Sequence, residues 1–198
     1  MSSVDHDDVA RLVRDSITVK NAVLHDDRLL RAIAGVAQEV AKALEQGGKL
    51  LLAGNGGSAA DAQHIASEFV GQFNTDRPGI AALALTTDTS ALTSVANDYG
   101  FEQVYSRQVE TLGRTGDVFL AVSTSGNSPN ILAALRAARQ AGLFTVALTG
   151  ASGGAARELC DVCLQIPSDD TPRIQESHIL VGHILCALVE EVLYPAPG

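Results

Sequence analysis

Short apolar runs alternate with amphipathic segments along most of this 198-residue chain. Five runs have the length of strands, and they span residues 49–53, 80–85, 117–122, 143–148 and 162–166. Continuous apolar runs are typical of strands buried on both faces. Helical segments are expected between them at about 58–70, 89–97 with 101–112, 129–141 and 153–159, and a long last helix is expected at about 172–194. This alternation predicts an α/β fold with a doubly wound, five-stranded parallel sheet.

Two further amphipathic helices are expected before the first strand. Residues 6–24 and 28–46 carry apolar residues at helical spacing, and Asp26-Asp27 separates them. A minimal sheet fold does not need these helices. They either form a packing arm at a subunit interface or cover one face of the sheet. We expect a single domain over residues 1–198, with a helical arm at 1–47 and an α/β core at 48–198.

Composition and charge narrow the function classes. Hydrophobic residues make up 46% of the chain, which favours a folded globule. The formal net charge of -9 argues against a nucleic acid or a membrane surface as the partner. The acidic start is not a signal peptide, and the apolar run from Ile179 to Val189 is interrupted by His183 and too short to span a bilayer. A cytoplasmic protein is therefore expected.

The turn after the first predicted strand, Gly54-Asn55-Gly56-Gly57-Ser58, leads directly into a helix. Free N–H groups and the helix dipole favour an anion at such a position. Asp61, His64 and Glu68 follow at i, i+3 and i+7, so they share one face of that helix. An anion cradle beside acid/base groups predicts a site for a small phosphorylated substrate.

A second turn, Ser123-Thr124-Ser125-Gly126-Asn127-Ser128, joins the third strand to a helix that begins at Pro129. Its four hydroxyls and its N–H groups can surround a phosphate without a lysine. The alternative is that they are turn and cap residues, and Ser128 is well placed as an N-cap. Capping does not need four hydroxyls, so phosphate binding is favoured. Ligands bind outside the carboxyl ends of such strands, and these turns are expected to meet at one crevice.

The last predicted helix carries Gln175 and His183, which are eight residues apart and about 80° around the helix. Both can face the crevice that holds His64 and Glu68. Two imidazoles, a carboxylate and an amide oxygen are ligands that zinc accepts. Alternatively, Glu68 and His183 are a general base and acid without a metal. His178 lies about 140° from His183 and is expected outside the site.

Four segments in order carry a family resemblance: Ala53–His64, Ala96–Gly100, Ser123–Ser128 and Arg173–His178. Together they closely resemble the sedoheptulose-7-phosphate isomerases (phosphoheptose isomerases) of the sugar-isomerase, or SIS, domain superfamily. The likeness spans nearly the whole chain. It implies a five-stranded SIS fold, a flavodoxin-like three-layer sandwich with two leading helices, and a homotetramer with sites between subunits.

The resemblance also implies roles for individual residues. It implies one Zn²⁺ per subunit, held by His64, Glu68, Gln175 and His183, with Glu68 and His183 as base and acid. It implies substrate binding by Asn55, Gly56, Gly57, Glu68, Asn97, Asp98, Ser123, Thr124, Ser125, Ser128 and Gln175, with the phosphate on the four hydroxyls. One departure is Gln72, where some members carry an arginine.

The implied activity is conversion of D-sedoheptulose 7-phosphate to D-glycero-D-manno-heptose 7-phosphate through an enediol, the first step of nucleotide-activated heptose biosynthesis. One alternative is an SIS isomerase for another sugar phosphate. Another is a non-catalytic SIS binding protein, such as a regulator that associates with the bacterial replication initiator. A binding protein would not need His64, Glu68, Gln175 and His183 together, and this chain has all four.

Overall fold

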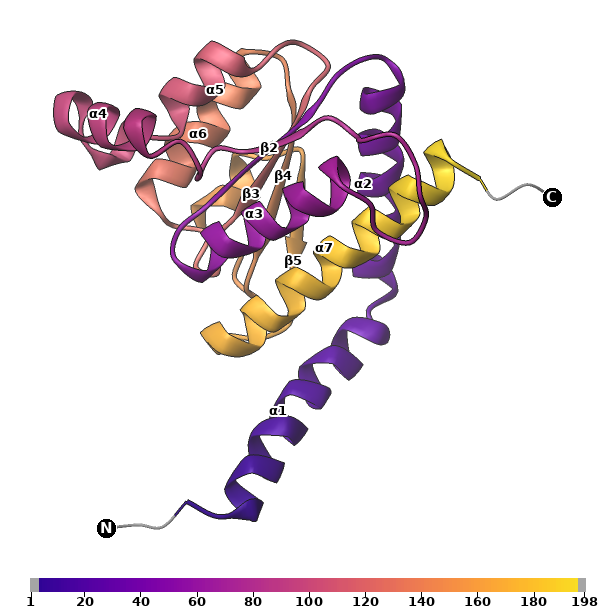
Figure 1. Cartoon of the computed structure of the whole chain (residues 1–198). Helices are drawn as coiled ribbons and strands as arrows, with labels where there is room; N and C mark the ends of the chain where they lie inside the picture. The colour runs from indigo at the N-terminus through magenta and orange to yellow at the C-terminus, as the bar shows by residue number, and fades with distance from the viewer. Residues whose placement is uncertain (1–3, 196–198) are drawn as a thin grey trace.

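In the computed structural model, which describes residues 4–195, a parallel sheet lies between two layers of helices (Figure 1). The sheet order is β2-β1-β3-β4-β5. The strands are β1 (Leu50–Gly54), β2 (Ala82–Ala84), β3 (Val118–Val122), β4 (Phe144–Thr149) and β5 (Val162–Gln165). All four strand pairs are parallel, which confirms the predicted fold class. Residues 1–3, part of the acidic start, and 196–198 lie outside the described residues.

Successive residues of the central strands point into different layers. Leu50 and Leu52 pack with the helices on one face, while Leu51 and Ala53 pack on the other. Side chains alternate across a strand, so a sheet that is covered on both faces needs a continuous apolar run. Strands β2 and β5 lie at the edges and are less buried. The predicted run 80–85 forms only three strand residues because an edge strand has a neighbour on one side only.

The helices follow the predicted order with small shifts at their ends. They are α1 (His6–Leu24), α2 (Asp27–Glu45), α3 (Gly57–Val70), α4 (Thr89–Tyr99), α5 (Ser106–Leu112), α6 (Pro129–Gln140) and α7 (Thr171–Leu193). The expected helix at 101–112 is divided, since residues Phe101–Gln103 form a 3₁₀ turn before α5. The expected helix at 153–159 is also a 3₁₀ segment, Gly154–Glu158.

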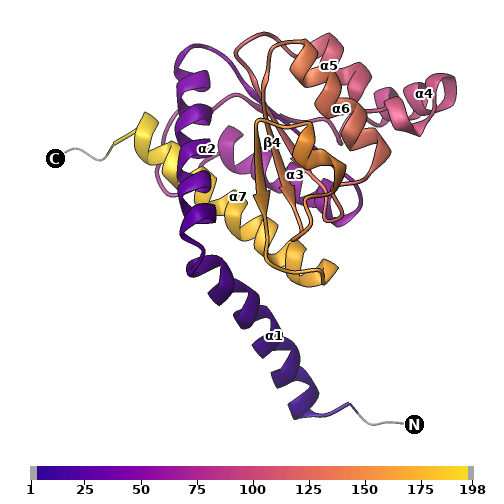
Figure 2. The ribbon, with the colours of Figure 1, turned by 180° about the vertical axis from the view of Figure 1, so that it is seen from behind.

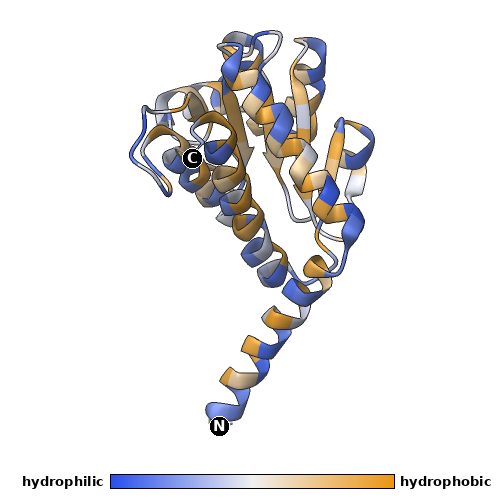
Figure 3. Cartoon of the chain, turned by 90° about the vertical axis from the view of Figure 1, so that its right-hand side faces the viewer, coloured by the Kyte–Doolittle hydropathy of each residue, from blue (hydrophilic) through white to orange (hydrophobic). Residues whose placement is uncertain are grey.

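The two leading helices have different surroundings. Helix α2 buries seven residues against the sheet and α7, so it covers the sheet. Helix α1 projects from the body (Figure 2), and Val23 is its one buried residue. The apolar side chains Val9, Leu12, Val13 and Ile17 are 48–56% exposed, and orange bands mark apolar positions along α1 in Figure 3. The covering interpretation is therefore confirmed for α2, whereas α1 leaves its apolar face uncovered within the chain.

Across residues 4–195, no helix combines the length and the apolar character that a membrane crossing requires.

Candidate functional site

Three predicted ligands meet where α3 lies beside α7. His64 Nε2 is 2.9 Å from His183 Nε2 and 3.2 Å from Glu68 Oε1. Ligand atoms of these three residues all lie within 4.8 Å of one another. The helices can approach here because Gly182 precedes His183, and a Cβ at Gly182 would lie 2.5 Å from Ile65 Cδ1. Because Gly182 has no side chain, α7 lies close enough to α3 for the two imidazoles to meet.

The geometry of this cluster suits a divalent metal. Zinc binds histidine nitrogen at 2.0–2.1 Å in tetrahedral sites, which sets neighbouring ligand atoms about 3.3 Å apart. The two short separations around His64 Nε2 are close to that value. Two histidines and one glutamate are also a known donor set of catalytic zinc sites, which keep a further position open. The three side chains could therefore hold a metal ion.

Asp61 lies one turn before His64 on α3. Its Oδ2 atom is buried and has no hydrogen-bond partner among the described residues. Burial raises the pKa of the Asp61 carboxyl, and the positive charge of a protonated His64 acts in the opposite direction. No hydrogen bond joins Asp61 to His64 among the described residues, so the geometry gives Asp61 no role as a partner of this imidazole.

The glycine turn is held in place by side chains from distant parts of the chain. Asn55 and Asn130 exchange two hydrogen bonds, Nδ2 to Oδ1, of 2.8 and 2.9 Å. Tyr105 donates its hydroxyl to the Gly54 carbonyl at 2.5 Å. Gly56 has a φ of +56°, a conformation that glycine adopts at little cost. The turn is therefore rigid, and Asn130 fixes it to the start of α6.

The serine turn lies at the same edge of the sheet, because Asn130 belongs to the first turn of α6. Ser123 Oγ and Ser128 Oγ face each other at 3.2 Å. Ser128 occupies the N-cap position of α6, as expected, but its hydroxyl makes no capping bond. The hydroxyl instead turns toward Ser123. A bond from the Ala155 amide to Asn127 Oδ1 supports the turn from outside.

Gln175 lies on α7, with its side chain beside the start of α3 and apart from the three-residue cluster. A Cβ at Gly57 would be 2.6 Å from Gln175 Nε2. His64 follows Gly57 by seven residues, which is about 10 Å along a helix. The structure therefore separates two groups of predicted residues. Gln175 and the two turns lie at the carboxyl edge of the sheet. His64 and Glu68 lie two or more helical turns further along α3, where His183 of α7 meets them.

Asn97 and Asp98 lie at the end of α4, the helix at the outer side of the fold in Figures 1 and 2. Both are exposed, and α4 buries no residue. Within the described residues their side chains hydrogen-bond only to each other, Asn97 Nδ2 to Asp98 Oδ1 at 2.7 Å. The chain by itself therefore does not bring them to the His64 cluster. Gln72 is likewise exposed.

Sequence analysis did not single out three side chains near the site. Asn130 pairs with Asn55, and Phe73 lies beside His183 with ring centroids 5.5 Å apart. Arg77 donates to the Glu68 carbonyl at 2.9 Å. A polar residue in the first turn after the serine loop was an available signal for Asn130. Nothing local marks Phe73 or Arg77, because their partners on α7 lie more than a hundred residues away.

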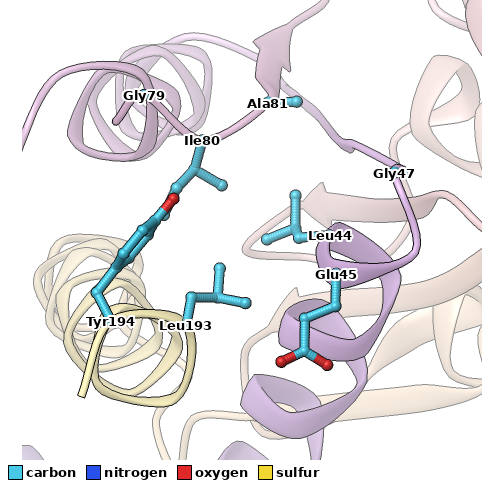
Figure 4. Close-up of a pocket in the computed structure, with 9 residues that line it drawn as sticks. Leu44, Glu45, Gly47, Gly79, Ile80, Ala81, Leu193 and Tyr194 are labelled. Carbon is cyan, nitrogen blue, oxygen red and sulfur yellow. The ribbon is translucent and has the colours of Figure 1, made fainter. Parts of the chain in front are cut away.

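A surface hollow of about 350 Å³ lies between the ends of α2 and α7 (Figure 4). Leu44, Ile80 and Leu193 point into it. Its lining, all within residues 4–195, includes none of the predicted site residues. The hollow is therefore separate from the candidate site.

Comparison with known proteins identifies relatives of this chain. The SIS domain family model matches residues 18–150. Phosphoheptose isomerase 2 of Campylobacter jejuni is 59% identical over 180 residues, 91% of this chain and 90% of the relative. Phosphoheptose isomerase of Aneurinibacillus thermoaerophilus is 57% identical over 92% of each chain. The solved phosphoheptose isomerase of Neisseria gonorrhoeae is 44% identical, with a TM-score of 0.88 over 93% of this chain and 98% of that chain.

Proposed function

Because this chain belongs to the phosphoheptose isomerase family of SIS-domain proteins, we propose that it converts D-sedoheptulose 7-phosphate to D-glycero-D-manno-heptose 7-phosphate, the first step of nucleotide-activated heptose biosynthesis. One observation carries the proposal: Glu68 and His183 lie together on α3 and α7, two helical turns from a glycine turn that is fixed to a serine turn. A scaffold or regulator has no use for such an acid/base pair.

The reaction moves one proton between neighbouring carbons. The Glu68 carboxylate takes a proton from C1 of the ketose, which gives an enediol, and returns a proton to C2. The His183 imidazole gives a proton to the oxygen on C2 and receives one from the oxygen on C1. The two groups lie within 4.8 Å of each other, so both can reach the same pair of carbons.

We propose zinc as the metal, with His64, Glu68 and His183 as ligands and water or a substrate oxygen in the fourth position. Gln175, expected as a further ligand, lies beside Gly57 in this chain, about two helical turns from the cluster. When bound, zinc would polarise the carbonyl and the enediolate oxygens. In this arrangement His64 acts only as a metal ligand and takes no part in proton transfer. Glu68 has two roles, as a metal ligand and as the base. These roles compete, because a carboxylate that ligates a metal is a weaker base.

The phosphate is assigned to Ser123, Thr124, Ser125 and Ser128. Asn55, Gly56, Gly57 and Gln175 then line the sugar between that loop and the cluster. The glycine turn and the cluster are about 10 Å apart along α3, measured from Gly57 to His64, so a sugar that contacts both must be extended.

We further propose a cytoplasmic homotetramer of single-domain subunits, with sites completed between subunits. Asn97 and Asp98 bind substrate in this arrangement, although they lie away from the cluster of their own chain. The exposed apolar side chains of α1 support an interface, since such a patch marks contact surfaces. In this arrangement α1 acts as the packing arm, while α2 covers the sheet of its own chain.

Turnover of sedoheptulose 7-phosphate by the pure protein tests the proposal. We expect activity that a chelator removes and zinc restores. Glu68→Gln should lower kcat by about 10²–10⁴-fold, the usual contribution of a general base. Glu110→Gln, at an exposed position of α5, is the matched control and should keep activity. His64→Ala should lose bound zinc. Full activity of Glu68→Gln, or no turnover by zinc-loaded wild type, would refute the assignment.

An isomerase for another sugar phosphate is the second candidate. The fold of SIS proteins does not by itself choose the sugar. A panel of five-, six- and seven-carbon ketose phosphates separates the two candidates by kcat/KM. We expect the seven-carbon substrate to be preferred, and a higher kcat/KM for a shorter sugar would favour the alternative.

A further inference from the structure

A buried ion pair joins the loop after α3 to α7. Arg77 Nε lies 2.7 Å from Glu190 Oε2, and the two side chains are only 2% and 3% exposed. Neither Arg77 nor Glu190 belongs to the site residues predicted from the sequence. Arg77 lies in the loop that follows α3, the helix that carries Glu68. Glu190 lies on α7, seven residues beyond His183.

The Arg77 guanidinium caps the end of α3. Its NH2 group donates to the Glu68 carbonyl at 2.9 Å, and its NH1 group donates to the carbonyls of Phe69 and Gly71 at 2.9 and 3.2 Å. The last carbonyls of a helix have no partner within the helix, and a cation is favoured there. Arg77 therefore holds the backbone of the residue that we assign as the base.

The Glu190 carboxylate holds the loop itself. It accepts backbone N–H bonds from Phe73, Asn74 and Thr75 at 3.4, 2.9 and 3.0 Å. Burial opposes its charge, but bonds from Arg77 and these amides lower the pKa of Glu190, so it is ionised at neutral pH. The loop conformation that results carries the Phe73 ring against the His183 imidazole, at 5.5 Å between ring centroids.

We propose that Arg77 and Glu190 are positioning residues for the His64–Glu68–His183 cluster, and that Phe73 is the side chain through which the loop orients His183. This inference rests on the proposed function. A buried ion pair adds little net stability, because desolvation offsets its attraction. Its effect here is geometric: one pair fixes the end of α3, the loop and α7 relative to one another.

Glu190→Gln tests the inference, with Asp117→Asn as a matched control. The Asp117 side chain is also 3% exposed and also pairs with a cation, Lys49, at 2.6 Å. Its other bonds are to the backbone amides of Lys49 and Arg114, not to α3 or α7. The two variants thus remove equivalent charges, but only Glu190 belongs to the site.

Zinc affinity of the metal-stripped protein, measured by competition with a chromophoric chelator, is the first readout. We expect Glu190→Gln to weaken it 10–100-fold, the usual effect of losing a group that orients ligands. Its kcat should fall by a similar factor while KM changes less. Asp117→Asn should lower the melting temperature but leave zinc affinity and kcat unchanged. Phe73→Leu, which leaves the ion pair intact, should weaken zinc binding with a smaller loss of melting temperature.

Several results would overturn the inference. Wild-type zinc affinity and kcat in Glu190→Gln would do so, as would equal losses in Asp117→Asn. If Glu190→Gln does not fold, unchanged zinc affinity in Phe73→Leu rejects the part assigned to the loop, and unchanged affinity in Arg77→Lys rejects the pair. A wild type that neither binds zinc nor turns over substrate rejects the proposed function, and this inference with it.

Discussion

His178 is a buried ionisable residue close to the site, and its surroundings keep it neutral. It is fully buried, and its Nε2 atom donates to the Thr149 carbonyl at 3.1 Å. Nδ1 is buried without a partner among the described residues, so it carries no proton. Burial lowers the pKa of His178 to about 4, although the bond to Thr149 acts in the opposite direction. This histidine joins α7 to β4 and is not a ligand, as its angle to His183 had predicted.

The pKa of His178 predicts a pH dependence of stability. In the unfolded chain a histidine titrates near 6.5, so between pH 6.5 and pH 4 the unfolded state binds a proton that the folded state does not. The stability contribution is complete above pH 6.5 and decreases as the pH falls. We expect the difference in unfolding free energy between wild type and His178→Gln to shrink by about 2 kcal/mol from pH 7 to pH 5.

Urea unfolding of the metal-free proteins at one protein concentration measures this difference. His6→Gln, at a histidine that is far from α7 and exposed, is the control and should follow wild type at both pH values. A difference for His178→Gln that does not change with pH would contradict the prediction.

At the scale of elements, helix α1 differs from the rest of the fold. An amphipathic helix gains most of its stability by packing its apolar face. Helix α2 packs that face within the chain, whereas α1 leaves Val9, Leu12, Val13 and Ile17 exposed. Beside them lies a hollow of about 440 Å³, to which α7 contributes Arg173 and Glu176. This surface is suited to a second copy of the chain.

A charge on this face of α1 should weaken the oligomer. We expect Leu12→Asp to shift the protein toward smaller species at micromolar concentration, because the carboxylate would be buried without a partner. Thr18→Asp is the control, since Thr18 is exposed about 180° around the helix from Val9. Analytical ultracentrifugation measures both, with circular dichroism to verify folding. An unchanged oligomer in Leu12→Asp would exclude this face as an interface.

At the scale of the whole molecule, the proposed reaction uses two groups of residues that lie apart in the chain: the metal-binding cluster and the Asn97-Asp98 pair. His64, Glu68 and His183 come from one chain. Asn97 and Asp98 lie on α4 without contact to them. A site shared between subunits resolves this separation, because a neighbouring copy can supply what its own chain cannot bring near.

Mixed oligomers test whether the site is shared. Glu68→Gln and Asp98→Ala should each be inactive alone. If Asp98 serves a neighbour's cluster, random mixing of the two variants restores about a quarter of the wild-type sites in a closed symmetric oligomer. Glu68→Gln mixed with His183→Ala is the control and should stay inactive, since both residues belong to one cluster. Co-expression with two affinity tags and an activity assay give the result, and no recovery would contradict a shared site.

The sequence by itself determined the order of elements, the parallel sheet and the type of chemistry. These depend on local patterns: apolar runs for β1, β3 and β4, helical spacing for α3 and α7, and turns rich in glycine and serine. The family resemblance added the expected activity and the substrate-binding roles of Asn97 and Asp98. Local patterns also placed the break between the two leading helices correctly, since Asp26 of the Asp26-Asp27 pair caps α2.

Tertiary structure alone decided how distant residues meet. His64 and His183 are 119 residues apart, and they approach because Gly182 lets α7 lie against Ile65. The same is true of Asn55 with Asn130, of Arg77 with Glu190, and of the Ser128 hydroxyl, which faces Ser123 instead of capping α6. Periodicity describes each element separately, whereas these contacts depend on how elements pack. For that reason the candidate ligands and the type of chemistry were predictable from the residues, but the contacts that hold these side chains in place were not.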